Sequence, residues 1–133
     1  MKLKGLEMSM GLKKGLLEAL EDRERQAVEE YLQRLLSEYG SHIREVILFG
    51  SKARGEGDSE SDIDIMVLVD SDDWRLHKEM GNIGAEIDLK YDVVLMDFFI
   101  GPKRFQVMQE LKEPLYQEVK RDGIELWKST LKS

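Results

Sequence analysis

Residues 47–70 read ILFGSKARGEGDSESDIDIMVLVD, two apolar runs separated by a polar segment. The first apolar run is followed directly by Gly50 and Ser51, and the second begins with two acids, Asp62 and Asp64. Short apolar runs bounded by a glycine-rich polar segment are typical of buried strands. The stretch therefore predicts two strands joined by a polar loop, with two negative charges at the start of the second strand.

The relative direction of these two strands follows from the length of the loop that connects them. About ten residues connect them, whereas a parallel crossover generally needs a dozen or more. We therefore expect the strands, 45–49 and 61–69, to be antiparallel. Apolar residues fall on both faces of the second strand after Asp64, which predicts a central strand covered on both sides.

Helical patterns flank this pair. Apolar residues recur at helical spacing over 12–39, with an expected break at the polar stretch 21–25 and a stop at Gly40. A cap in 71–73 begins a second helix that reaches Lys90. The residues expected on its buried face are Trp74, Met80, Ile83 and Ile87.

The C-terminal third predicts shorter elements. Residues 91–96 form the third expected strand, and one or two short amphipathic helices follow Pro102, interrupted at Pro114. Residues 123–127 are either a last strand or an ordered tail. The expected fold class is α/β (α+β), a small mixed sheet flanked by helices, in one domain over 1–133. Within it, we expect an N-terminal helical segment in 1–40, a catalytic core in 43–96 and C-terminal helices in 97–133.

Composition and net charge exclude several classes of function. The chain has 133 residues, 41% of them hydrophobic, and a formal net charge of −7, so it is a poor non-specific nucleic-acid binder. It contains no cysteine, which excludes thiolate metal sites and cysteine nucleophiles. Neither a signal peptide nor an apolar run of membrane-spanning length is visible, so a cytoplasmic protein is expected.

The two acids point to metal chemistry. Side chains alternate along a strand, so Asp62 and Asp64 project from one face with Cα atoms roughly 6–7 Å apart. Two ionised carboxylates at that separation repel each other unless a cation lies between them. Mg²⁺ typically uses one or two carboxylates together with substrate phosphates, and two such ions form the clamp used in phosphoryl displacement. Mn²⁺ is an alternative ion.

The loop before the acids suits a phosphate. Gly50 allows close approach of an anion to the backbone, and N–H groups at a helix start point toward it. The Ser51 hydroxyl adds a donor, and the Arg54 guanidinium adds a charge suited to phosphate. A phosphate cradle beside a carboxylate pair is what a nucleoside triphosphate with Mg²⁺ requires.

Together, 50–55 (GSKARG) and 61–65 (SDIDI) resemble the signature of the minimal nucleotidyltransferase family, in the DNA polymerase β-like superfamily. The resemblance covers roughly 43–96 and implies a mixed sheet flanked by helices. It also implies transfer of a nucleoside monophosphate from an NTP, here ATP, to an acceptor hydroxyl. Either motif alone is weak evidence for this family, but the two motifs together at this spacing are specific for it.

The resemblance also implies roles for individual residues. The triphosphate would be bound by Gly50 and Ser51, and Arg54 and Ser61 are further predicted nucleotide contacts. Asp62 and Asp64 would ligate both metal ions. A third acid, Asp92, would complete the metal site near the acceptor and help deprotonate its hydroxyl.

Alternative roles stay open for the third acid, for Arg54 and for Lys52. Asp88 and Asp97 compete with Asp92, which is preferred because it falls inside the predicted strand, where a carboxylate needs a partner. Arg54 is either a phosphate ligand or the structural partner of a loop aspartate. Lys52 is expected to be solvated, with contact to a phosphate as the alternative.

The length of chain after the third strand bears on the acceptor. About 35 residues remain, too few for a separate acceptor domain, so a partner chain or a homo-oligomer is expected to hold the acceptor. Members of the family resemble antitoxins paired with a helical HEPN ribonuclease, which implies transfer of AMP to that toxin. Two alternatives stay open: a small-molecule transferase of the aminoglycoside-modifying type, and a binding antitoxin without chemistry.

Overall fold

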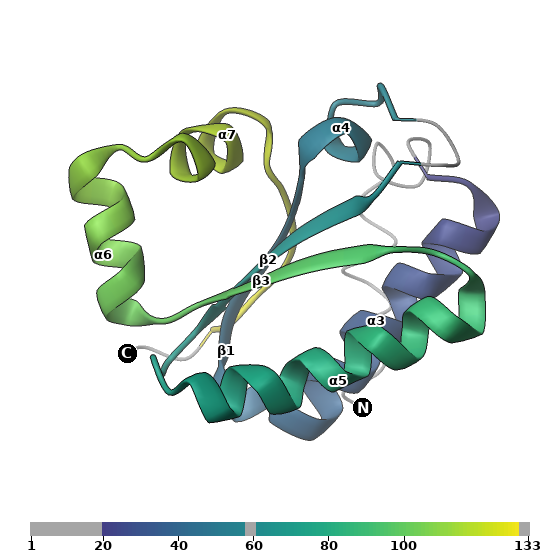
Figure 1. Ribbon diagram of the computed structural model, residues 1–133, viewed down its shortest axis with the longest axis horizontal. Helices are drawn as coiled ribbons and strands as arrows, with labels where there is room; N and C mark the ends of the chain where they lie inside the picture. Colours follow the sequence, from purple (N-terminus) through teal and green to yellow (C-terminus); the bar gives the residue numbers. More distant parts are fainter. Residues whose placement is uncertain (1–19, 58–60, 131–133) are drawn as a thin grey trace.

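The structure, a computed structural model, describes residues 20–57 and 61–130 (Figure 1). In these residues the helices are α3 (Asp22–Tyr39), α4 (Gly50–Ala53), α5 (Trp74–Tyr91), α6 (Pro102–Leu111) and α7 (Pro114–Asp122), with a 3-10 turn at Gly40–His42. The strands are β1 (Ile43–Phe49), β2 (Ile63–Val69), β3 (Leu95–Ile100) and β4 (Ile124–Lys128). The predicted α+β class is confirmed.

The strands form one mixed sheet in the order β3-β2-β1-β4. As predicted, β1 and β2 are antiparallel, and Phe49 lies opposite Asp64 in their register. Strand β3 joins β2 in parallel, with Met96 beside Asp64. This register places the end of β1, the start of β2 and the start of β3 at one end of the sheet.

Helices cover the sheet on both sides (Figure 1). The larger core lies between the sheet and helices α3 and α5, and it includes Tyr31, Leu35, Ile65, Met80 and Ile87. A smaller cluster lies between the sheet and helices α6 and α7 and is built from Phe49, Met66, Ile100 and Met108. The strongly apolar pattern of β2 is therefore explained by burial on both of its faces.

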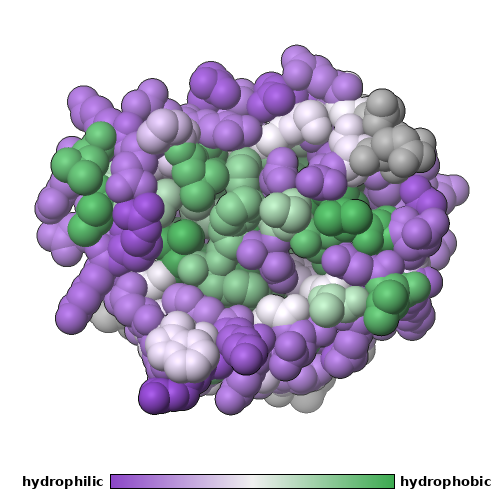
Figure 2. Space-filling view, in the orientation of Figure 1, coloured by the Kyte–Doolittle hydropathy of each residue, from purple (hydrophilic) through white to green (hydrophobic). Residues whose placement is uncertain are grey.

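The side of α6 and α7 is not filled completely. A cavity of about 310 Å³ lies against Ile47 and Met66 of the sheet, with Phe105 and Tyr116 among its helical lining. Figure 2 shows apolar side chains gathered in the middle of this view, inside a rim of polar ones. Along β2, Met66 is two residues beyond Asp64 and projects from the same face.

Several predicted boundaries need correction. The third strand begins at Leu95 rather than Tyr91, because α5 continues to Tyr91 and ends in a left-handed Asp92 with φ 56°. Trp74 is exposed rather than buried on α5. Residues 124–128 form a strand that pairs with β1, which is the strand alternative predicted for 123–127 and adds a strand to the helices of the segment 97–133. The helical pattern predicted over 12–19 lies outside the described residues.

Other boundaries are confirmed. Asp73 caps α5, and its side chain accepts a hydrogen bond from the Arg75 N–H at 2.9 Å. Pro102 and Pro114 begin α6 and α7, as expected for proline in the first turn of a helix. In the described part of the chain, no helix is long and apolar enough to cross a membrane.

Candidate active site

The site is centred on the contact between Gly50 and Asp64. Gly50 ends β1 and begins α4 with φ +77°, a left-handed conformation that side chains disfavour. A Cβ added to Gly50 would lie only 2.1 Å from Oδ2 of Asp64. The absence of a side chain at this position therefore lets the Asp64 carboxylate lie directly against the backbone of the loop.

Ser51 follows in the short helix α4, and the loop after it folds back on its carbonyl. The backbone N–H of Glu56 donates to the Ser51 carbonyl at 2.9 Å, and that of Gly57 donates at 3.3 Å. A Cβ on Gly57 would come within 3.0 Å of the Ser51 hydroxyl. Because the first N–H groups of a helix have no partner within it, this compact turn is suited to an anion.

The two acids differ in environment. Asp62 is exposed, while Asp64 is half-buried at the start of β2. Burial raises the pKa of Asp64, and the negative charges of Asp62 and Glu118 raise it further, against a smaller opposing effect of Arg54. A cation bound between the carboxylates would relieve this repulsion. The donor set, two carboxylates with room for phosphate oxygens, fits a hard divalent ion.

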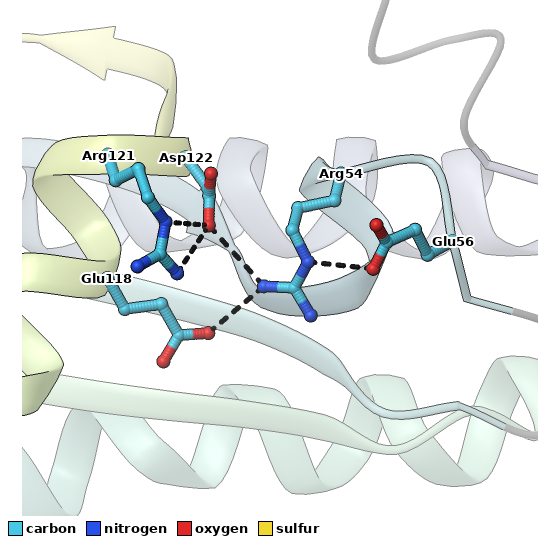
Figure 3. Close-up of polar contacts among 5 residues, drawn as sticks. All are labelled: Arg54, Glu56, Glu118, Arg121 and Asp122. Atoms are coloured by element: carbon cyan, nitrogen blue, oxygen red, sulfur yellow. Dashed lines mark hydrogen bonds and ion pairs between the residues drawn. The ribbon is translucent and has the colours of Figure 1, made fainter.

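Arg54 contacts three carboxylates (Figure 3). Its Nε donates to Oε1 of Glu56 at 2.9 Å, and its Nη1 lies 3.5 Å from both Glu118 and Asp122 of α7. Asp122 also pairs with Arg121 at 2.9 Å. These contacts make Arg54 a structural partner of carboxylates, one from the loop and two from α7. Its role as a phosphate ligand stays a prediction.

The predicted exposure of Lys52 is wrong. Lys52 was expected to be solvated, but it is 1% exposed and its Nζ lies 2.5 Å from Oε2 of Glu24 in α3. Sequence reasoning missed Glu24 altogether. The sequence carries one signal for it, an acid three residues after Glu21 at a helix start, which is typical of a capping box. No pattern in the sequence points from Glu24 to Lys52.

None of the three candidates for the third acid joins the pair. Asp97 projects from the face of the sheet opposite to the one that carries Asp64, and its Oδ2 accepts a hydrogen bond from the Tyr31 hydroxyl at 2.9 Å. Asp88 accepts from the backbone N–H of Leu95. Asp92 lies at the end of α5, its side chain 99% exposed, with Arg23 at 3.8 Å.

The positions beside the two acids on β3 are apolar. Met96 is in register with Asp64, and the carbonyl of Val94 accepts from the N–H of Ile63, next to Asp62. Both Val94 and Met96 are exposed. Among residues 20–57 and 61–130 no three acidic or histidine side chains are grouped as a metal site. The structure therefore brings together Gly50, Ser51 and Asp64, with Asp62 adjacent, and the role of Asp92 stays a prediction.

Comparison with known proteins identifies the family of the chain. A family model described as a nucleotidyltransferase domain matches residues 28–120, which include the loop and both acids. The chain belongs to this family. It is a nucleotidyltransferase, and its fold class and catalytic class are those that the two motifs predict.

Two curated relatives come from Methanocaldococcus jannaschii. A candidate protein adenylyltransferase, MJ0604, is 40% identical over 73 residues, which cover 54% of this chain and 68% of the relative. A second candidate protein adenylyltransferase, MJ0141, is 34% identical over 82 residues, which cover 61% and 76% of the two chains.

Solved structures share the fold. A crystal structure of a toxin–antitoxin with AMP-PNP superposes with a TM-score of 0.52 at 24% identity, over 76% of this nucleotidyltransferase and 73% of that chain. A mutant of the toxin–antitoxin MntA-HpeT superposes with a TM-score of 0.51 at 22% identity, over the same shares.

Proposed function

We propose that this nucleotidyltransferase is Mg²⁺-dependent and transfers AMP from ATP to a hydroxyl on a partner protein. The observation that carries the proposal is the contact of the Asp64 carboxylate with Gly50, which puts the carboxylate pair against the loop suited to phosphate. Asp62 and Asp64 would hold the metal, and Gly50 and Ser51 would bind the triphosphate. Bound metal supplies positive charge that offsets the charge of the reacting phosphates.

The reaction would be an in-line displacement. An acceptor hydroxyl oxygen forms a bond to the α-phosphorus of ATP, the bond from that phosphorus to the bridging oxygen breaks, and pyrophosphate leaves. The hydroxyl proton passes to a carboxylate, a role that the family resemblance implies for Asp92. The loop and the acids contribute by positioning the nucleotide and by stabilising charge.

A protein is favoured as the acceptor for two reasons. The net charge of −7 disfavours RNA, whose phosphates require a basic surface. The curated relatives are named for protein adenylylation, and the structures of similar fold come from toxin–antitoxin complexes. We therefore propose an antitoxin role, with a HEPN-type toxin as the acceptor and its tyrosine, serine or threonine hydroxyl as the nucleophile.

The acceptor is tested by co-expression with the product of the neighbouring gene. Intact-mass spectrometry of that product is expected to show added AMP, absent when Asp62 and Asp64 are both replaced by Asn. Rapid modification of a free aminoglycoside, with the partner left unmodified, would favour the small-molecule transferase. Neutralisation of the toxin without any added mass would favour the binding antitoxin.

Ser51→Ala is expected to weaken Mg-ATP binding by about 1.5–3 kcal/mol, because one hydroxyl contact to a charged phosphate is lost. The measurement is calorimetric titration of the wild type and the variant. Ser41→Ala, a serine outside the loop in the turn before β1, is the matched control and should titrate like the wild type. Equal affinity for all three proteins would remove the Ser51 hydroxyl from the nucleotide site.

Asp92→Asn is expected to lose transfer to the acceptor while keeping ATP binding, because it removes the carboxylate proposed to take the hydroxyl proton. Its partner Arg23 provides a control, since Arg23→Gln breaks the same exposed ion pair without removing a carboxylate. Transfer rates in both variants are measured with α-labelled ATP. An undiminished rate in Asp92→Asn would exclude Asp92 from the chemistry.

A further inference from the structure

The ion pair between Glu24 and Lys52 is the most deeply buried charged contact among the described residues. Both residues are 1% exposed, and Lys52 Nζ lies 2.5 Å from Glu24 Oε2. Removing two charges from water is costly, and apolar replacements of such pairs are often neutral or stabilising. Stability alone therefore gives a weak reason for this pair, whereas fixing one arrangement of two elements gives a better one.

The pair connects two elements that are far apart in the sequence. Glu24 lies in the first turn of α3, where its other oxygen, Oε1, accepts from the N–H of Glu21 at 3.0 Å. Lys52 lies in α4, immediately after Ser51. One carboxylate thus holds both the start of α3 and the helix of the phosphate loop.

The side chain of Lys52 also contacts the turn after α4. A Cβ on Gly57 would lie 3.0 Å from Lys52 Cδ and 3.0 Å from the Ser51 hydroxyl oxygen. The Lys52 stem and the Ser51 hydroxyl are therefore packed against the same point of the loop. Both groups therefore depend on the absence of a side chain at Gly57.

We infer that Glu24 and Lys52 are positioning residues, which hold the Gly50–Ala53 helix in the orientation that binds the triphosphate. In this arrangement the Lys52 ammonium is directed toward Glu24 in α3. Lys52 therefore affects nucleotide binding indirectly, by fixing the position of its neighbour Ser51. The inference rests on the proposed function for its link to ATP, but the ordering of the loop can be measured without any nucleotide.

The test uses a double variant, Glu24→Gln with Lys52→Met, which removes both charges and keeps an oxygen for the Glu21 N–H. The matched control is Glu30→Gln with Lys90→Met, the same substitutions in a more exposed pair, 2.8 Å apart, between α3 and α5. Hydrogen–deuterium exchange of ligand-free protein is followed in peptides covering 50–57. Glu24→Asp, which keeps both charges but shortens the carboxylate, is measured alongside and serves if the double variant does not fold.

Exchange in 50–57 is expected to rise about ten-fold or more in the double variant and by less in Glu24→Asp, with wild-type exchange in the control. The dissociation constant of Mg-ATP is expected to rise on the order of ten-fold, because small displacements of a positioning group are costly. Weaker binding with unchanged exchange would overturn the inference and make Lys52 a direct phosphate ligand. Failure of the wild type to bind Mg-ATP would instead contradict the proposed function, and the exchange would still decide the positioning role.

Discussion

Gly50→Ala is expected to lose both stability and nucleotide binding. A left-handed residue other than glycine costs about 1–3 kcal/mol, and an added methyl group in a packed site costs a further 1–3 kcal/mol. The methyl group would lie 2.1 Å from Oδ2 of Asp64, so the carboxylate must move away from the loop. Chemical denaturation should show the fall in unfolding free energy, and calorimetry should show the loss of Mg-ATP affinity.

Gly55→Ala is the matched control for this prediction. Gly55 is also left-handed, with φ +73°, but a Cβ there would have no atom within 4 Å. It should therefore carry the backbone cost without the clash and retain ATP binding. Equal stability and equal affinity in the two variants would show that the contact between Gly50 and Asp64 has no role in the site.

Replacing both Asp62 and Asp64 by Asn is expected to reduce transfer by at least about 10²–10³-fold, the effect of removing one dominant electrostatic group from an active site. The double variant removes both proposed ligands while preserving side-chain size. Its control, Glu86→Gln with Glu110→Gln, makes the same change in net charge on exposed helix positions away from the site. Transfer by this control should match that of the wild type.

The same variant should change how stability depends on pH. The pKa of Asp64 is raised in the folded protein, so the folded state holds this proton more tightly than the unfolded state does. Its contribution to stability is full below the unfolded pKa and is lost as pH rises through the folded pKa. Without metal, the Tm of the double Asn variant should exceed that of the wild type increasingly as pH rises from acid toward neutral. A constant difference in Tm across this range would contradict the raised pKa of Asp64.

Some parts of the fold and of the site could be predicted from the sequence, and others could not. The antiparallel pair of β1 and β2 was predicted from an expected connection of about ten residues, shorter than a parallel crossover generally needs. The connection between the observed strands, residues 50–62, is longer because β2 begins at Ile63, but its only described helix is the four-residue α4. The loop and the acid pair were predictable because glycine, serine and alternating aspartates have local consequences for backbone and charge. These are interactions between residues close together in the chain.

The errors concern contacts between distant residues. Lys52 looked solvated because its partner, Glu24, lies 28 positions earlier and no local pattern links them. Asp92 looked like a strand residue because Val93 and Val94 follow it, but the packing of α5 extends that helix to Tyr91. The apolar neighbours of the acid pair on β3 depend on the strand register, which places Met96 beside Asp64.

We propose that Asp62 and Asp64, together with the loop at Gly50, form one site for metal and nucleotide. The most direct test of this proposal is calorimetric titration of the wild type and the double Asn variant with a non-hydrolysable ATP analogue, with and without Mg²⁺. The wild type should bind the analogue much more tightly with Mg²⁺ than without it, because phosphate oxygens and carboxylates share the ion. The variant should show no gain from Mg²⁺. An equal gain from Mg²⁺ in both proteins would contradict the assignment of this site.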